Sequence, residues 1–394
     1  MNSQLELTWS DLGETYDGPH ATPKRISEGP YFLNISSLVN GRLELSQSDH
    51  VSEDEFTKWT RRVTPQEGDL LFSYETRLGE AALMPGGIKA CLGRRMALLR
   101  PNRDVIYPRF LLYYYLSPAF QRLIEQNTIY GATVNRISLS TMGKWPVSIP
   151  QLSEQQAIAE VLGALDDKIA ANSMKASTAE QLAGVLFDKV SVDLKKIPVS
   201  QVLTPILGGT PNRKNPEFWG GQVHWASAKD VTSAPHSVVA DTEEKITRMA
   251  TEQTKAKPLP IGGVIVTARG TVGAVARLAL PTSFNQSCYG FSPSELPPGL
   301  LYFSILRAAQ RAKSLSHGSV FDTITMKTFD HLFIPDFGES AEKMEHQIAP
   351  LLETVDSSIK ENKTLVSMRD ALLPQLMSGK LRVRDAEEVV ENVL

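Results

Sequence analysis

The sequence predicts an α+β protein in which two tandem copies of one domain are each followed by a long helix. Three observations support this fold class: a duplication with a period of about 190 residues, short β-rich runs between glycines and prolines, and two stretches in which apolar residues recur with heptad spacing. A period of this length is far longer than a solenoid repeat and has the size of a domain.

The duplication is clearest in short runs that keep their order in both halves. Residues 68–73 (Gly-Asp-Leu-Leu-Phe-Ser) are matched by residues 262–267 (Gly-Gly-Val-Ile-Val-Thr), 194 positions later. Further matches share residue type and order: Leu78-Gly79 with Val272-Gly273, Ile137 with Ile324, and Ile149-Pro150 with Ile334-Pro335. The offset changes by a few positions, as expected if loops between fixed elements differ in length. Each half therefore contains the same set of elements.

Each half also has one predicted helix of moderate length. The first is expected at residues 110–127, where Pro118 would divide or kink it, and its counterpart at residues 300–314. The β-rich runs around these helices, such as residues 70–73 and 264–267, are bounded by glycine and proline. Strands and helices therefore mix within each domain.

Two longer helices are predicted after Pro150 and Pro335, because apolar residues there alternate spacings of four and three. The first seam contains Ile158, Leu162, Leu165, Ile169, Asn172, Ala176, Ala179, Ala183 and Leu186. The second seam contains Ile348, Leu352, Val355, Ile359, Asn362, Val366, Arg369, Leu373 and Leu376.

Two arrangements of these helices are open: each lies on its own domain, or the two pair with each other. We predict that they pair as an antiparallel coiled coil, because small residues of the first seam complement larger ones of the second. Asn172 and Asn362 would then meet near the centre of the pair. Such a pair would act as a ruler between the two domains.

Composition places the chain among ordinary globular proteins. It has 394 residues, of which 42% are hydrophobic, so each half is large enough to bury its own core. The two cysteines, Cys91 and Cys288, match no disulfide or zinc spacing. No apolar run reaches the length of a membrane span, and the first residues do not resemble a signal peptide. We expect a cytoplasmic protein with reduced thiols.

The charge of the chain is unevenly distributed. Residues 196–336 carry 14 basic and 10 acidic residues, whereas residues 337–394 carry 7 basic and 11 acidic ones. The second domain therefore has a modest excess of basic residues, and the second helical segment has an excess of acidic ones. The net charge of the whole chain is −3. A basic patch attracts phosphates whatever the total charge, but an excess this small predicts weak DNA binding without partners.

The motifs of common enzymes are absent from the sequence. It has no phosphate-binding GxxxxGK[ST] loop, no GxGxxG turn, no GxSxG elbow and no HExxH helix, and its seven histidines are not at metal-ligand spacing. Asp166-Asp167-Lys168 is similar to half of a nuclease signature, but its counterpart reads Asp356-Ser357-Ser358. We interpret this segment as a solvated helix face and expect no catalytic, metal-binding or cofactor-binding residues in the chain.

Several motifs in order resemble those of one family, the specificity subunits of type I restriction–modification systems. Residues 207–211 (Leu-Gly-Gly-Thr-Pro), followed by Phe218-Trp219-Gly220-Gly221 and His224-Trp225, resemble the opening of a target recognition domain. Residues 150–156 and 165–169 resemble the start of the family's first conserved helix, and residues 372–381 resemble the end of the second. In the first domain the opening reads Gly18-Pro19-His20-Ala21-Thr22-Pro23 instead.

The resemblance covers essentially the whole chain and implies five segments. They are a first target recognition domain (1–150), a first coiled-coil helix (151–195), a second target recognition domain (196–336), a second coiled-coil helix (337–384) and a C-terminal tail (385–394). It also implies a non-catalytic reader of double-stranded DNA with a split recognition sequence. The expected partners are two methyltransferase subunits, which bind S-adenosylmethionine, and endonuclease/translocase subunits, which use ATP and Mg.

Base readout requires polar side chains on loops, with arginine suited to guanine and asparagine or glutamine to adenine. By this criterion the DNA-binding candidates of the first domain are Arg77, Arg94, Arg95, Asn135 and Arg136. Those of the second domain are Asn212, Arg213, Lys214, Lys229, Arg269, Thr271, Asn285 and Gln286. Lys214 and Lys229 suit phosphate better than a base. The alternative is a duplicated scaffold that binds proteins, whose partner affinity would lack the steep salt dependence of DNA binding.

Overall fold

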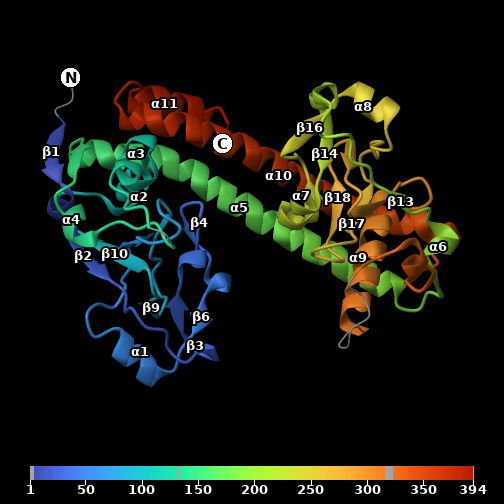
Figure 1. Ribbon diagram of the computed structural model, residues 1–394, viewed down its shortest axis with the longest axis horizontal. Coiled ribbons are helices and arrows are strands. Elements are labelled where there is room, and N and C mark those ends of the chain that lie inside the picture. Colours follow the sequence, from blue (N-terminus) through green and yellow to red (C-terminus); the bar gives the residue numbers. More distant parts are fainter. Residues whose placement is uncertain (1–3, 132, 316–322, 394) are drawn as a thin grey trace. The chain divides into compact units, whose positions relative to one another are not determined.

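The computed structural model describes residues 4–131, 133–315 and 323–393 (Figure 1). The chain forms two compact units: unit 1 comprises Met1–Lys168 and Leu365–Leu394, and unit 2 comprises Ile169–Thr364. Each unit contains one repeated domain together with parts of both long helices. The predicted boundaries between domains and helices stay predictions, because the compact units divide the chain within the helices.

Unit 1 contains a main antiparallel sheet with the strand order β2-β10-β7-β8. Its strands are β2 (Gly13–Asp17), β7 (Leu70–Ser73), β8 (Ala81–Leu83) and β10 (Met96–Pro101). A small sheet of order β6-β3-β9 consists of β3 (Ile26–Leu33), β6 (Asp49–His50) and β9 (Ala90–Leu92). Two strand pairs complete the unit: β1 (Leu5–Thr8) with β11 (Pro146–Ile149), and β4 (Leu38–Val39) with β5 (Arg42–Leu43).

The short helices of unit 1 lie between its strands in the sequence or near its C-terminal end. They are α1 (Glu53–Trp59), α2 (Pro108–Leu116), α3 (Pro118–Gln126), α4 (Leu139–Met142) and α11 (Val383–Glu391). Helix α2 packs on β7 and β8, whereas α1 packs on β3 and β9 of the small sheet. In Figure 1 the small sheet and α1 form a lobe that projects from the main sheet of this unit.

Unit 2 has a main sheet of order β13-β20-β17-β18-β15 and a small sheet of order β16-β14-β19. The main-sheet strands are β13 (Ile206–Leu207), β15 (Val238–Val239), β17 (Val264–Thr267), β18 (Val275–Leu278) and β20 (Cys288–Phe291). The small sheet contains β14 (Trp219–Ala226), β16 (Glu244–Ile246) and β19 (Thr282–Phe284), and β12 (Lys196–Pro198) pairs with β21 (Phe333–Pro335).

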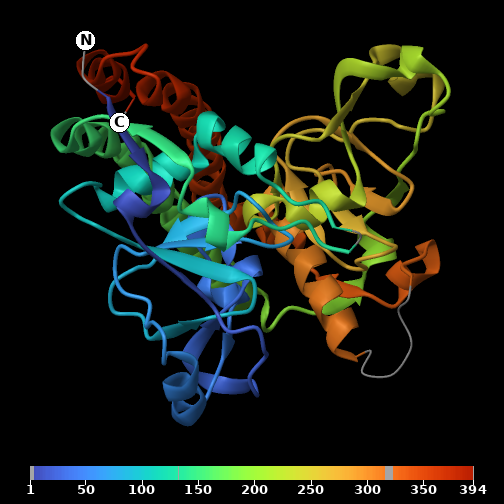
Figure 2. The same cartoon turned by 60° about the vertical axis from the view of Figure 1, so that its left-hand side comes forward.

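Several α-helices belong to the second domain within unit 2. They are α6 (Val199–Val202), α7 (Ala228–Ser233), α8 (Arg248–Gln253) and α9 (Pro298–Leu315). Helix α9 packs on β17 and β18, and α8 packs on β14. Strands β14 and β16 and helix α8, lime to yellow in Figure 2, project from the main sheet as the equivalent lobe does in unit 1.

The strand orders show that the duplication extends to topology. Strands β2, β10, β7 and β8 of unit 1 correspond in order to β13, β20, β17 and β18 of unit 2. In both small sheets the central strand pairs in parallel with one neighbour (β9 or β19) and antiparallel, with a register shift, with the other (β6 or β16). The predicted α+β fold with two tandem domains is confirmed.

An aromatic cluster in unit 1 explains how the helix predicted at residues 110–127 is divided. Ser117 accepts a hydrogen bond from the Phe120 amide, and Pro118 begins α3, where the missing N–H has no cost. The break turns Phe120 toward Trp9 and Tyr115, with ring centroids 5.3 and 5.0 Å away. All three rings are buried, and burial of a Phe-sized side chain contributes about 1.5–3 kcal/mol. The division at Pro118 is confirmed.

The two long helices are α5 (Leu152–Ser191) and α10 (Ala341–Met377), and within unit 2 they pack antiparallel. Asn172 donates to the Asn362 side-chain oxygen at 3.1 Å, and Asn362 donates to the Ser173 hydroxyl at 3.1 Å. Further along α5, Ala179 packs in a cluster with Val355, which precedes Asn362 on α10. Residue numbers therefore rise on one helix as they fall on the other, and the predicted Asn contact is confirmed.

Part of each seam also packs into a domain core. Ala183 and Phe187 of α5 lie in the main core of unit 2 with Ile348 and Leu352 of α10. Within unit 2 the two helices therefore pair with each other and also pack on the domain, so features of both arrangements considered from the sequence occur. Two seam positions were wrong by one residue: Phe187 is buried whereas Leu186 is only partly so, and Leu365 is buried whereas Val366 is only partly so. A straight α-helix drifts from a strict heptad, which explains the shift by one residue.

Asp166, on the part of α5 in unit 1, is not on a solvated helix face as the sequence analysis proposed. Its side chain is only 19% exposed and accepts hydrogen bonds from Tyr113 Oη at 2.6 Å and from Arg369 of α10 at 2.8 Å. Burial, reinforced by the Asp166 charge, raises the pKa of Tyr113 above its ordinary value, so the phenol stays a donor. Arg369, placed in an apolar seam, thus has a charged partner.

Both cysteines are buried free thiols, Cys91 on β9 and Cys288 on β20. Burial raises the pKa of each thiol to about 12, so both are protonated at neutral pH. Throughout the described residues, no helix combines the length and the apolar character that a bilayer span requires.

We expect Ala176→Leu to destabilise unit 2, because Ala176 is buried in the thin part of the α5–α10 contact beside Val355. Overpacking of this kind costs about 1–3 kcal/mol, so the midpoint of urea unfolding should fall. The control is Met174→Leu, two residues away on α5, where the side chain is 73% exposed. Equal midpoints for the two variants would contradict tight packing at Ala176.

Candidate nucleic-acid interface

Three loops of unit 2 are joined by backbone hydrogen bonds at one end of its main sheet. The Gly208 amide, after β13, donates to the Cys288 carbonyl at 3.1 Å. The Ala268 amide, after β17, donates to the Ser287 carbonyl at 2.7 Å, and the Ile324 amide donates to the Ala268 carbonyl at 3.0 Å. These bonds place the opening loop, the loop before β20 and the turn after β17 side by side.

Unit 1 repeats the same three bonds at the equivalent positions. The Gly18 amide donates to the Met96 carbonyl at 2.8 Å, and the Tyr74 amide donates to the Arg95 carbonyl at 3.2 Å. The Ile137 amide donates to the Tyr74 carbonyl at 2.8 Å. Both domains therefore hold the same loops in a common backbone frame, and we call these two sets of loops the paired loop frames.

One glycine in each frame is required by the close approach of the backbone. A Cβ atom at Gly208 would lie 2.2 Å from the Asn285 carbonyl oxygen, and one at Gly18 would lie 2.4 Å from the Gly93 carbonyl oxygen. The first domain lacks the Gly-Gly-Thr-Pro opening of the second. It nevertheless keeps the one glycine that the frame requires.

In unit 2 the predicted residue Arg213 is held by neighbouring side chains. Its guanidinium lies 3.9 Å from the ring centroid of Trp219 and donates to Glu244, with Nη2–Oε2 at 2.8 Å. This hydrogen bond raises the pKa of Arg213, and it lowers the pKa of Glu244. Trp225 stabilises the same loop, residues 208–215, by donating its Nε1–H to the Gly209 carbonyl at 2.9 Å.

Other predicted residues of unit 2 fall into two groups. Those whose side chains have local partners are Asn212 and Asn285, which accept from backbone amides, Lys229, which pairs with Glu243, and Gln286, which accepts from the Thr210 hydroxyl. Lys214 and Arg269 are exposed, and neither side chain has a hydrogen-bonding or ion-pair partner in the described part of the chain. Thr271 is exposed beside Arg269 in the turn after β17.

In unit 1 the predicted residues divide in the same way. Arg77 donates to the Ile35 carbonyl at 3.0 Å and pairs with Glu80, so it braces the turn that it occupies. Arg94 and Arg136 are exposed and, among the residues that the structure describes, their side chains have no such partner.

The remaining predicted residues of unit 1 link neighbouring loops. Arg95 donates to the Thr76 hydroxyl at 3.2 Å, and its Nε lies 3.3 Å from the Glu75 carboxylate. Asn135 is exposed, and its carbonyl accepts the Thr76 amide at 3.0 Å. Residues from three separate predicted loops therefore meet around Thr76.

Arg61 and Arg62 were missed by the sequence analysis. They line a pocket of about 300 Å³ that also contains Asp17 and His20 of the opening loop. Arg62 donates to Asp17 at 2.7 Å, whereas Arg61 is exposed. The available signal was the adjacent pair of arginines directly after a short helix, which adds positive charge at the opening loop.

The fold and these loops define a class: a duplicated recognition protein in which one backbone frame carries different polar side chains in each copy. Among the described residues, no group of three His, Cys, Asp or Glu side chains could hold a metal ion. A model of the type I restriction modification DNA specificity domain matches residues 27–181 and again residues 192–366. The chain belongs to this family and is therefore a DNA-specificity protein.

Relatives and a solved structure agree with this assignment. The HindI specificity subunit of a type I restriction enzyme from Haemophilus influenzae is 21% identical over 439 residues, which span 89% of this chain and 94% of the relative. The MjaIX specificity subunit from Methanocaldococcus jannaschii is 27% identical over 175 residues, or 43% of this chain and 39% of the relative. The crystal structure of a type I S subunit from M. genitalium has a TM-score of 0.60 at 14% identity, with 95% and 96% of the two chains covered, and so shares the fold.

We expect two adjacent cations of the second domain to respond differently to alanine substitution. Lys214→Ala should leave the melting temperature unchanged and reduce the slope of log affinity against log salt by about one, since an exposed lysine without a partner contributes through phosphate alone. Arg213→Ala should also lower stability by about 0.5–1 kcal/mol, because it loses its contact with Trp219.

These effects are measurable by thermal melting and by fluorescence anisotropy of a labelled duplex over a range of salt concentrations. The control is Lys343→Ala, an exposed lysine on α10 outside the loop frames. A salt slope for Lys214→Ala equal to that of the control would contradict a phosphate contact at Lys214.

Proposed function

We propose that this chain is the specificity subunit of a type I restriction–modification complex and that each domain reads one half of a split DNA sequence. The observation that carries the proposal is the paired loop frames. Their backbone hydrogen bonds are equivalent, but the exposed side chains differ. Arg94 of the first domain corresponds to Gln286 of the second, on the loop that precedes β10 or β20.

The difference between these two residues suits two different half-sites. Arginine makes paired hydrogen bonds with the O6 and N7 atoms of guanine, and glutamine with the N6 and N7 atoms of adenine. The residues of the turns after β7 and β17 also differ, with Glu75-Thr76-Arg77 in one domain and Arg269-Gly270-Thr271 in the other. Two equivalent loop frames that carry different polar side chains fit a bipartite target whose two halves differ in sequence.

The partners in this proposal supply what the chain lacks. Two methyltransferase subunits would bring S-adenosylmethionine for adenine methylation, and endonuclease/translocase subunits would bring ATP and Mg. The relatives are named as subunits of type I restriction enzymes, which supports such an assembly. The net charge of −3 supports it too, because basic partner surfaces would strengthen DNA binding by this chain.

We expect a host that expresses this chain with its methyltransferase partner to methylate adenines within one bipartite motif. Replacing residues 196–336 with the equivalent segment of a homologue should change one half of that motif and leave the other half intact, because each frame lies within its own domain. Single-molecule sequencing of genomic DNA reads both halves. Deletion of this gene provides the control, since the motif should then lose its methylation.

A motif that changes in both halves would contradict independent reading by the two domains. If no motif appears in the presence of the chain and its methyltransferase partner, the proposed function is wrong. Proteins that merely scaffold a complex would change the amount of methylation without changing the sequence that carries it.

We also propose that the paired helices α5 and α10 set the number of base pairs between the half-sites. Adding seven residues to both helices, after Ala171 and after Asn362, keeps the heptad phase and lengthens the pair by about 10 Å. The motif should then gain about three base pairs of spacer while both halves stay the same. Adding seven residues to α5 alone is the control, since it breaks the register. An unchanged spacer in an active double insertion would exclude the helices as the ruler.

A further inference from the structure

Thr76 occupies a backbone conformation that threonine rarely adopts. Its φ angle is +69°, in the left-handed region, where the Cβ atom of a branched side chain is crowded by the backbone. The equivalent residue of the second domain is Gly270, whose φ angle is +76°. The two domains therefore share this turn, but only the second fills it with the residue that the turn favours.

The turn itself does not require a side chain at this position. Apart from its neighbours in the chain, a Cβ atom at Gly270 would meet no atom within 4 Å, so the space around the equivalent site is open. The flanking glycines Gly79 and Gly273 are also left-handed in both copies, with φ angles of +87° and +75°. Glycine at position 76 would satisfy the same backbone without strain. The backbone of the turn therefore does not account for a threonine at this position.

The surroundings of Thr76 point to a role in binding. Arg95, itself left-handed with a φ angle of +71°, donates to the Thr76 hydroxyl at 3.2 Å. The Thr76 amide donates to the Asn135 carbonyl at 3.0 Å. Strained residues that the surrounding structure holds in place cluster at ligand-binding sites. Here two of them meet on the loops that belong to the first frame.

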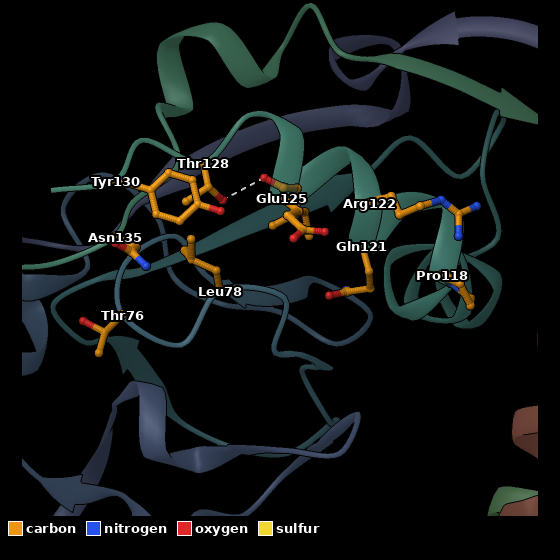
Figure 3. A pocket seen from close by; sticks show the side chains of 10 residues that line it. Thr76, Leu78, Pro118, Gln121, Arg122, Glu125, Thr128, Tyr130 and Asn135 are labelled. Atoms are coloured by element: carbon orange, nitrogen blue, oxygen red, sulfur yellow. Dashed lines mark hydrogen bonds between the residues drawn. The ribbon is translucent and has the colours of Figure 1, made fainter.

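The side chain of Thr76 is exposed at the rim of an open pocket of about 520 Å³. Figure 3 shows Thr76, Asn135 and Tyr130 at one end of this pocket and Gln121, Arg122 and Pro118 of α3 at the other. Arg95 donates to the oxygen of the Thr76 hydroxyl, so the hydrogen of that hydroxyl remains available to an acceptor atom of a base. The methyl group of Thr76 can contact the methyl group of thymine.

We propose that Thr76 is a specificity-determining residue of the first domain, which contacts a base of the first half-site while Arg95 positions its hydroxyl. This proposal rests on the proposed function, because it needs a half-site that the first domain reads. Thr76 would then contact one base pair from a position at which the second domain has a glycine, Gly270, and therefore no side chain.

The test compares Thr76→Gly with the unaltered chain, each purified in complex with the methyltransferase subunits. The probes are labelled duplexes that carry the motif methylated by the unaltered complex, and variants in which each base pair of the first half is changed in turn. We expect Thr76→Gly to raise the melting temperature by about 2–4 °C through loss of strain. Its affinity for the motif should fall about tenfold, and it should lose discrimination at one base pair.

The matched control is Asn40→Gly, which relieves a second left-handed residue of unit 1, in the hairpin between β4 and β5 (φ +50°). This variant should keep both the affinity and the full base preference. Thr76→Ser, which keeps the hydroxyl, should restore discrimination if the base accepts its hydrogen bond, and Thr76→Val should restore it if the base contacts the methyl group.

A purely structural role gives the opposite result, in which Thr76→Gly lowers the melting temperature and the base preference is unchanged. That outcome, or a Thr76→Gly complex with unaltered affinity and preference, overturns the inference. Failure of the unaltered complex to recognise any motif is a separate result, which counts against the proposed function.

Discussion

The backbone hydrogen bonds within each loop frame are the constraint on which the proposed recognition surface depends. They join an amide after the opening strand, the carbonyl after β7 or β17, and the loop before β10 or β20, with lengths of 2.7–3.2 Å in both domains. Because these bonds use only main-chain atoms, they are indifferent to the side chains that the loops carry, except where a glycine is needed. A fixed backbone with free side chains allows one fold to serve two different recognition tasks.

The duplication made much of the fold predictable, because a repeated pattern is evidence for each element twice. The division of a helix at Pro118 and the contact between Asn172 and Asn362 followed from local chemistry and heptad spacing. Tertiary packing decided the rest. Leu365 replaces Val366 in the buried seam, and the Asp166 side chain is largely shielded from solvent because Arg369 and Tyr113, from segments distant in sequence, donate hydrogen bonds to it. A short helix, α11 (Val383–Glu391), also covers most of the segment 385–394 that was expected to be a tail.

The candidate site shows a sharper limit of sequence reasoning. Polar residues between strands identify loops, and the frames bring those loops together. The sequence does not tell which cations are free, because their partners lie elsewhere in the chain. Arg213 is held by Glu244, 31 positions away, whereas its neighbour Lys214 has an exposed side chain. The strain at Thr76 was likewise invisible until its φ angle could be compared with that of Gly270.

The burial of both native thiols has a practical consequence for labelling experiments on this protein. Cys91 and Cys288 are shielded from solvent, and burial raises the pKa of each to about 12, so alkylating reagents find almost no thiolate at neutral pH. A single cysteine introduced on an exposed loop would then be the one fast-reacting thiol. Fluorophores or cross-linkers can thus be attached at chosen positions of either domain without first removing the native residues.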